Sequence, residues 1–273
     1  MNRWDGWFLG HRQRLPDIPS AAQVFPVRSV RALHDNSRQR DNAQISAARL
    51  SIVMLHRFQK NKRTKEVFEM TSQDRMFSAS EMPDRDWWQI LWPDPEGIVK
   101  TLGVRCGMEV VDLGCGSGYF TAALARQAGP GHVIAIDIDS EMLERARVAC
   151  RAMTNCIWCR GDAMELGRLI SDPVDFVLFA NALHGVPDKP ALAKQVWDIL
   201  RPGGRMAIVN WHPIARELTV VRGKPRGPDT RLRLSPAQTC EAMEPPGFRL
   251  EAVVEFPPYH YGAIFARPEE SVR

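Results

Sequence analysis

The segment Val110–Phe120 constrains the fold of this chain more than any other stretch. It reads VVDLGCGSGYF, so a short apolar strand runs into three glycines at alternate positions and then into a helix. Glycine adopts positive φ angles and lets the backbone approach a ligand without a Cβ collision. The end of the first strand is also where ligands bind in a doubly wound α/β sheet. We therefore predict a ligand-binding crevice at Gly114, Gly116 and Gly118.

The spacing of these glycines indicates which kind of ligand the crevice takes. A dinucleotide fingerprint, G-x-G-x-x-G, would need glycine at position 119, which is Tyr119. The pattern is instead D-x-G-x-G-x-G, starting at Asp112, and it suits a ligand with no pyrophosphate to seat on the helix N-terminus. This spacing argues against a nicotinamide-dependent dehydrogenase. A tight turn with no ligand is the plainer alternative, but three glycines cost conformational entropy that such a turn does not require.

Strand and helix signals alternate from about Asp86 to Ala266. The predicted strands are Glu109–Leu113, His132–Ile136, Cys156–Cys159, Asp175–Phe179, Arg205–Asn210, Phe248–Phe256 and Tyr261–Ala266. The predicted helices are Asp86–Leu102 (interrupted at Pro93 and Pro95), Tyr119–Ala128, Ser140–Ala152, Pro190–Leu200 and Ser235–Glu244. Such alternation implies right-handed crossovers in a parallel sheet. We predict a doubly wound, Rossmann-like three-layer α/β sandwich with a mostly parallel seven-stranded sheet and an antiparallel last strand.

The first seventy residues differ in composition from the rest. Through Met70 the chain carries 13 basic and 6 acidic residues, whereas the remainder carries 23 basic and 26 acidic residues. We expect residues 1–70 to be a basic, disordered extension, because they offer little apolar surface to bury; the alternative is that translation begins at Met70. Residues 71–273 would form the folded domain. Its mildly acidic balance argues against a nucleic-acid partner.

The composition also bears on where the protein works. No apolar run approaches the ~18 residues that a membrane span requires. Six cysteines in 273 residues do not form a disulfide framework, which favours reduced thiols and a cytoplasmic location. Cys156 and Cys159 stand in a C-x-x-C spacing, but no second such pair or paired histidine accompanies them. We predict no metal site, and we interpret Cys115 as a packing thiol.

Two acidic residues follow the second predicted strand and have different expected roles. Asp137 ends that strand about twenty residues beyond the glycine turn, where a carboxylate can accept both hydroxyl hydrogens of a ribose. Asp139 stands directly before Ser140 and the next helix, so helix capping is the better interpretation for it. The alternative for Asp137 is that it also caps that helix.

Five motifs in order resemble the class I S-adenosylmethionine-dependent methyltransferases, and within them the small-molecule, type 11 group that includes ubiquinone and menaquinone biosynthesis enzymes. They are Val110–Phe120, Ile136–Asp139 with Met142-Leu143, Gly161–Ala163, Phe179–His184 and Leu200–Gly204. The resemblance covers roughly Asp86 to Pro268. It implies that S-adenosylmethionine is the cofactor.

The resemblance also assigns roles by position. Gly114, Gly116 and Gly118 would line the methionine and ribose portion, and Asp112 would position that loop or reach the cofactor amino group through water. Asp137 would hold the ribose hydroxyls, with Ile138 against one adenine face. Asp162 would accept from the adenine amino group, the Ala163 backbone would help to read the ring, and Asn181 would contact the amino acid end.

Residues for the methyl acceptor are less sharply defined. His184 follows the fourth strand on the expected substrate face, and a base helps only when the acceptor must lose a proton. Many relatives carry a second histidine at the next position, where this chain has Gly185, so a structural role for His184 stands beside the catalytic one. Trp87, Trp88 and Trp92 would form a lid over the cofactor or pack in the core. Trp211, His212 and the turn Pro257–His260 would emerge on the same rim.

The long segment Pro213–Leu234 follows the fifth strand and carries a run of basic residues. These are Arg222, Lys224, Arg226, Arg231 and Arg233. A solvated charge run is the favoured interpretation, and binding of an anionic acceptor is the alternative.

The sequence thus predicts an enzyme that transfers a methyl group from S-adenosylmethionine to a small-molecule acceptor. Two alternatives remain: a methyltransferase acting on protein or RNA, and a cofactor-binding regulatory protein without turnover. Ala180–Leu183 replaces the Asn/Asp-Pro-Pro-aromatic motif of base and glutamine methyltransferases, which disfavours that chemistry.

Overall fold

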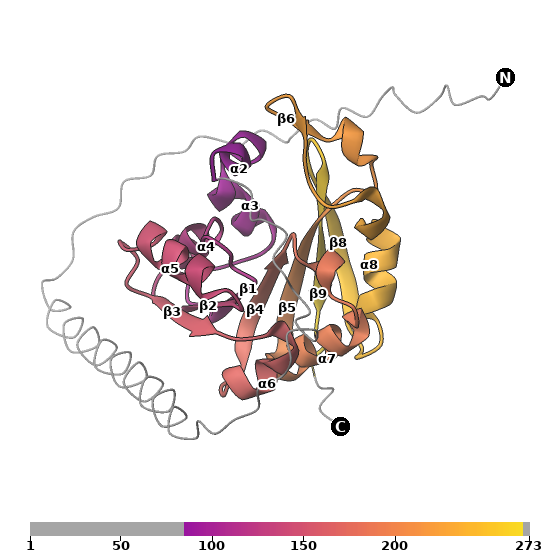
Figure 1. The fold of residues 1–273 in the computed structure, drawn as a ribbon. Helices are drawn as coiled ribbons and strands as arrows, with labels where there is room; N and C mark the ends of the chain where they lie inside the picture. Colours follow the sequence, from indigo (N-terminus) through magenta and orange to yellow (C-terminus); the bar gives the residue numbers. More distant parts are fainter. Residues whose placement is uncertain (1–84, 270–273) are drawn as a thin grey trace, which may run out of the picture. The chain divides into compact units, whose positions relative to one another are not determined.

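The computed structural model describes residues 85–269. The predicted extension 1–70 therefore lies outside the described residues, as does the boundary at residue 71. Strand and helix alternate through the described part (Figure 1), as the sequence predicts.

One seven-stranded sheet forms the centre of the domain, with strand order β3-β2-β1-β4-β5-β9-β8. Its strands are β1 (Val110–Leu113), β2 (Val133–Asp137), β3 (Cys156–Arg160), β4 (Val174–Ala180), β5 (Leu200–Trp211), β8 (Arg249–Phe256) and β9 (His260–Ala266). The neighbours among β3, β2, β1, β4 and β5 pair in parallel, and β9 runs antiparallel between β5 and β8. The predicted fold class and the antiparallel last strand are confirmed.

Helices cover both faces of the sheet, α3, α4 and α5 on one side and α6, α7 and α8 on the other (Figure 1). The helices are α2 (Arg85–Leu91), α3 (Pro95–Thr101), α4 (Thr121–Ala128), α5 (Ser140–Ala149), α6 (Leu166–Leu169), α7 (Lys189–Ile199) and α8 (Pro236–Met243). Short 3-10 turns are η2 (Ala163–Glu165), η3 (Leu183–Gly185), η4 (Arg216–Leu218) and η5 (Thr230–Leu232). The sheet is buried from both sides, which is why β1 is an uninterrupted apolar run apart from Asp112.

Local capping signals fix several helix starts where the sequence places them. Ser235 and Gln238 form a complete capping box at α8, and the Asp139 carboxylate accepts from the backbone N–H groups of Glu141 and Met142 at the start of α5. Capping by Asp139 is therefore confirmed. Each such cap satisfies helix-end donors that would otherwise lack a partner.

β5 begins at Leu200, five residues before the predicted start. Leu200 pairs with Val174, and a register shift in the ladder precedes the pairing of Arg205 with Phe176. Gly203 donates its N–H to the carbonyl of Arg267 at 2.9 Å. The Pro-Gly-Gly sequence is therefore an irregular part of the strand, held by hydrogen bonds with Arg267, which directly follows β9.

The segment between β5 and α8 has structure that the sequence does not reveal. It contains the two-residue strands β6 (Val220–Val221) and β7 (Lys224–Pro225), which pair antiparallel, together with η4 and η5. The Arg233 guanidinium, only 5% exposed, donates to the carbonyls of Ile214, Pro228 and Arg226 and to the Thr219 hydroxyl. Arg233 thus holds both ends of this segment together.

Candidate functional site

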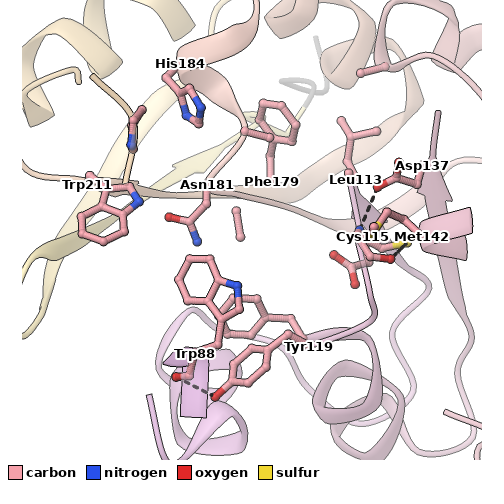
Figure 2. Close-up of a pocket in the computed structure, with 18 of the residues that line it drawn as sticks. Trp88, Leu113, Cys115, Tyr119, Asp137, Met142, Phe179, Asn181, His184 and Trp211 are labelled. Carbon is pink, nitrogen blue, oxygen red and sulfur yellow. Dashed lines mark hydrogen bonds between the residues drawn. The ribbon is translucent and has the colours of Figure 1, made fainter. Parts of the chain in front are cut away.

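A cavity of about 510 Å³ opens at the carboxyl ends of β1, β2, β4 and β5. The chain runs from β1 to β2 and β3 on one side of β1 and then crosses from β3 to β4 on the other side. The strand order therefore reverses between β1 and β4, and this is the switch point at which doubly wound sheets bind ligands. Figure 2 shows Asp137, Cys115 and Met142 on one side of the cavity and His184 and Trp211 on the other, with Asn181 between the two groups. We call the first side the glycine-loop half and the second the tryptophan half.

The glycine loop after β1 forms one wall. Gly114 and Gly116 line the cavity with φ angles of 66° and 52°, in the region that favours glycine. Gly118, with φ 80°, is not among the lining residues. A Cβ at Gly118 would lie 3.0 Å from the Cα and Cβ atoms of Ala146, so this glycine permits close packing of the loop against α5. Gly118 therefore packs against α5, whereas the other two predicted ligand-binding glycines line the cavity.

Asp137 ends β2 and faces the glycine loop. Its carboxylate accepts hydrogen bonds from the backbone N–H of Gly116 at 2.8 Å and of Asp139 at 2.9 Å. Burial raises the pKa of this carboxyl, and the two backbone donors partly oppose that shift. Asp137 therefore fixes the loop while it lines the cavity.

Asp112 lies beneath the same loop and is 3% exposed. The Thr121 hydroxyl donates to it at 2.6 Å. Burial raises the pKa of Asp112 from 3.8 to about 7, the Thr121 bond lowers it and the charge of Asp137 raises it further. A buried carboxyl of this kind gains from a positive charge brought into the cavity.

The remaining predicted cofactor residues complete this half. Ile138, Asp162 and Ala163 all line the cavity. One oxygen of Asp162 accepts from the backbone N–H of Met164 at 2.9 Å, which leaves the other oxygen for a ligand. Asn181, just after β4, adopts φ 57°, donates its backbone N–H to Val209 and has a buried side-chain oxygen without a hydrogen-bond partner.

Three tryptophans of α2 and its C-terminal end wall the tryptophan half. The rings of Trp87 and Trp88 stack with centroids 4.5 Å apart, and those of Trp88 and Trp92 at 4.8 Å. All three are at most 5% exposed and line the cavity with Trp211, whose ring lies 6.3 Å from Trp87. Core packing of these tryptophans is therefore confirmed, and they also line the cavity; their closing over the cofactor as a lid stays a prediction.

His184 lies on η3 and lines the same half. Burial lowers the pKa of its imidazole, and the charges of Lys189 and Arg233 lower it further. His212 donates its backbone N–H to Tyr259, which brings the turn after β8 onto this rim as predicted. His260 is buried among Trp88, Trp92 and Trp211, and it does not line the cavity.

The segment after β5 adds lining residues that the sequence did not single out for the cavity. Arg216, Pro225, Gly227 and Pro228 line it together with Arg226. The solvated interpretation holds for Arg222, Lys224 and Arg231, which are exposed, and is wrong for the buried Arg233 and for Arg226. Gly227, between Arg226 and Pro228, is the sequence feature that could have indicated this packing. A Cβ at Gly227 would lie 2.8 Å from the Trp211 ring, so only glycine fits there.

Cysteine side chains can serve as metal ligands or as nucleophiles. Residues 85–269 hold no cluster of three or more potential metal-ligating side chains, and all six cysteines are free thiols. Cys115 lies buried in the glycine loop, and burial strongly raises the pKa of its thiol, which makes it a poor nucleophile.

The residues present fit an adenosyl sulfonium compound. Three carboxyl groups, those of Asp112, Asp137 and Asp162, face one half of the cavity and suit hydroxyl, amino and cationic groups. The partnerless Asn181 oxygen adds an acceptor. The fold and this site together are those expected of a class I S-adenosylmethionine-dependent methyltransferase.

Comparisons with known proteins agree with that class. Residues 110–204 match the family described as a methyltransferase domain. Over 108 residues the chain is 37% identical to demethylmenaquinone methyltransferase of Staphylococcus aureus. The matched region covers 39% of this chain and 44% of that protein. The chain thus spans less than half the length of these curated relatives.

Solved structures share the fold of this chain. A SAM-dependent methyltransferase from Aquifex aeolicus superposes with a TM-score of 0.56 at 25% identity, over 66% of this chain and 92% of that one. The N-methyltransferase NodS from Bradyrhizobium japonicum, in complex with S-adenosyl-L-homocysteine, shares the fold with a TM-score of 0.54 at 16% identity, over 69% of this chain and 94% of that one. These findings support a methyltransferase domain at residues 110–204, similar to class I S-adenosylmethionine-dependent methyltransferases of the type 11 kind. None of the helices within residues 85–269 is long and apolar enough to cross a membrane.

Proposed function

We propose that this chain transfers the methyl group of S-adenosylmethionine to a small-molecule acceptor by in-line displacement. The observation that carries the proposal is the division of one cavity into an acidic glycine-loop half and an aromatic tryptophan half. The first half suits the cofactor and the second suits an uncharged or anionic organic acceptor. The identity of the relative from Staphylococcus aureus also favours a small molecule.

We assign the cofactor to the glycine-loop half, residue by residue. Gly114 and Gly116 would border its methionine and ribose portion, and Asp112 would offset its positive charge from below. The remaining contacts follow the positions of the lining side chains: ribose hydroxyls on Asp137, adenine between Ile138 and Ala163 with its amino group on Asp162, and the amino acid end near Asn181. Gly118 supports the loop through its packing on α5.

The protein's part in the reaction is mainly to align the acceptor and exclude water. The bound cofactor supplies a methyl carbon already activated on a sulfonium. Trp87, Trp88, Trp92 and Trp211 would orient the acceptor and keep solvent out. His184 would accept a proton from an acceptor that must lose one, because its lowered pKa keeps the imidazole neutral at neutral pH.

The cellular setting belongs to the same proposal. Free thiols at all six cysteines favour a reducing compartment, so we place the enzyme in the cytoplasm. A role without turnover, as a cofactor-binding regulator, is the second candidate, and it rests on the same glycine-loop half.

A binding and turnover experiment tests the proposal. Calorimetry should show one site for S-adenosyl-L-homocysteine per chain, and labelled S-adenosylmethionine should pass its methyl group to a member of an acceptor library, read by mass spectrometry. Failure to bind S-adenosyl-L-homocysteine would refute the cofactor assignment. Binding with no methylated product across small molecules, protein and RNA would favour the regulatory role.

A further inference from the structure

The tryptophan half of the cavity contains a positive charge that no described carboxylate neutralises. Arg226 lines the cavity, and its buried Nε has no hydrogen-bond partner. None of the ion pairs among residues 85–269 includes it. Its guanidinium lies over the Trp87 ring, 5.4 Å from the centroid. A half-buried cation with an unmet donor is costly unless a ligand meets it.

The backbone of Arg226 is held firmly in place. Its N–H donates to the carbonyl of Thr219 at 2.8 Å, and its carbonyl accepts from the Thr219 hydroxyl at 2.7 Å and from Arg233 at 2.9 Å. The next residue, Gly227, adopts φ 84° and lies against Trp211. The guanidinium is thus presented from an ordered loop, and its place at the cavity is built into the fold.

Two further arginines place positive charge near this half. Arg216 also lines the cavity and donates to the carbonyl of Gly227 at 3.0 Å. Arg233 is bonded only to neutral oxygens and lowers the pKa of His184 by its charge. Asp229, on the same loop, is exposed and paired with Arg231. A cationic acceptor would meet repulsion here, although aromatic walls alone would suit one.

The aromatic walls define the shape of the molecule that brings the anion. Trp87, Trp88 and Trp92 form a continuous stack, with interplanar angles of 22° and 19° between successive rings. Each has a buried indole N–H without a partner, although each side chain is at least nine-tenths buried and lines the cavity. These rings offer the cavity an apolar wall, so a molecule that suits this wall has a flat apolar face.

We propose that the methyl acceptor of this enzyme is a planar aromatic molecule with an anionic group, lying against the tryptophan wall with its anion on Arg226. The inference rests on the proposed function, since it assigns the tryptophan half to the acceptor. The main alternative is that Arg226 binds the carboxylate of the cofactor. The two assignments predict different losses when Arg226 is replaced.

The test compares matched aromatic probes by calorimetry at pH 7, with the full chain saturated in S-adenosyl-L-homocysteine. Three pairs differ only in charge: benzoate and benzamide, 4-hydroxybenzoate and 4-hydroxybenzamide, 2-naphthoate and 2-naphthamide. We expect at least one carboxylate to bind about tenfold or more tightly than its amide, the scale of a hydrogen bond to a charged group. Benzyltrimethylammonium should not bind. Equal affinity within all three pairs, or tighter binding of the cation, would overturn the inference.

Variants then locate the anion. Arg226→Met keeps the apolar stem over Trp87 and should abolish the preference for carboxylate while the Kd of S-adenosyl-L-homocysteine stays within about twofold. Arg231→Met, on the same loop but exposed, should leave both unchanged. A loss of S-adenosyl-L-homocysteine affinity in Arg226→Met would assign the arginine to the cofactor and refute the inference. If the unaltered chain does not bind S-adenosyl-L-homocysteine at all, the proposed function is refuted, and the assignment of an acceptor is refuted with it.

Discussion

Replacing Asp137 with alanine should weaken cofactor binding more than it weakens the fold. The carboxylate accepts from the backbone N–H groups of Gly116 at 2.8 Å and Asp139 at 2.9 Å, and the proposal adds two ribose hydroxyls. Hydrogen bonds to a charged group contribute about 1.5–3 kcal/mol each, and the freed hydroxyls regain water. We expect Asp137→Ala to cost about 1–3 kcal/mol of binding free energy, roughly a 5- to 150-fold rise in Kd.

The assay is calorimetric titration with S-adenosyl-L-homocysteine, accompanied by thermal unfolding of each variant. The effect on stability should be smaller, because the substitution also removes the free-energy cost of burying a charged carboxylate, the same cost that raises the pKa of Asp137. Asp139→Ala is the matched control: it removes a cap of α5, should cost about 1 kcal/mol of stability and should leave the Kd unchanged. A folded Asp137→Ala protein that binds the ligand as well as the unaltered chain would refute the ribose assignment.

Four further predictions address the fold and the site. Gly118→Val should lower the unfolding midpoint, because its side chain would meet Ala146 at 3.0 Å from a backbone with φ 80°; an unchanged midpoint would contradict the packing role. The carboxyl of Asp112, whose pKa in the folded protein is raised to about 7, makes the unaltered chain less stable as pH rises from about 4 to 7. Asp112→Asn should therefore gain stability relative to the unaltered chain over that range. Parallel curves of unfolding free energy against pH, measured in urea, would exclude this. Arg233→Met should destabilise the protein by about 2 kcal/mol or more, since the carbonyls of Ile214 and Pro228 lose their donor, and chemical denaturation measures it. A chain that starts at residue 71 should bind S-adenosyl-L-homocysteine with unchanged affinity by calorimetry; a truncated protein that does not fold would show that the extension is structural.

Local signals in the sequence predict most of the fold and the glycine-loop half. The apolar strand before Gly114 fixes β1, and the acid at the end of the next strand is Asp137 at the cavity. Helix capping by Asp139 is predicted correctly because a cap depends on its position directly before a helix start, whereas the ribose role of Asp137 stays a prediction. These features arise from residues near one another in the chain, where propensity and capping rules apply.

The tryptophan half depends on contacts between distant segments, which one sequence does not reveal. Arg226 lies in a charge run that looks solvated, and only the pairing of β6 with β7 and the hydrogen bonds from Arg233 bring it to the cavity. Gly118 illustrates the same limit within a recognised motif. Its spacing matches the two ligand-facing glycines, but its neighbour is the backbone of α5.

The most direct test of the account is the crystal structure of the chain grown with S-adenosyl-L-homocysteine. We predict electron density for the adenosyl group between the glycine loop and Ile138, with both ribose hydroxyls on the carboxylate that ends β2. Density for that compound elsewhere on the protein, or a dinucleotide pyrophosphate seated at Gly114–Gly116, would contradict the assignment of this crevice to a methyl donor.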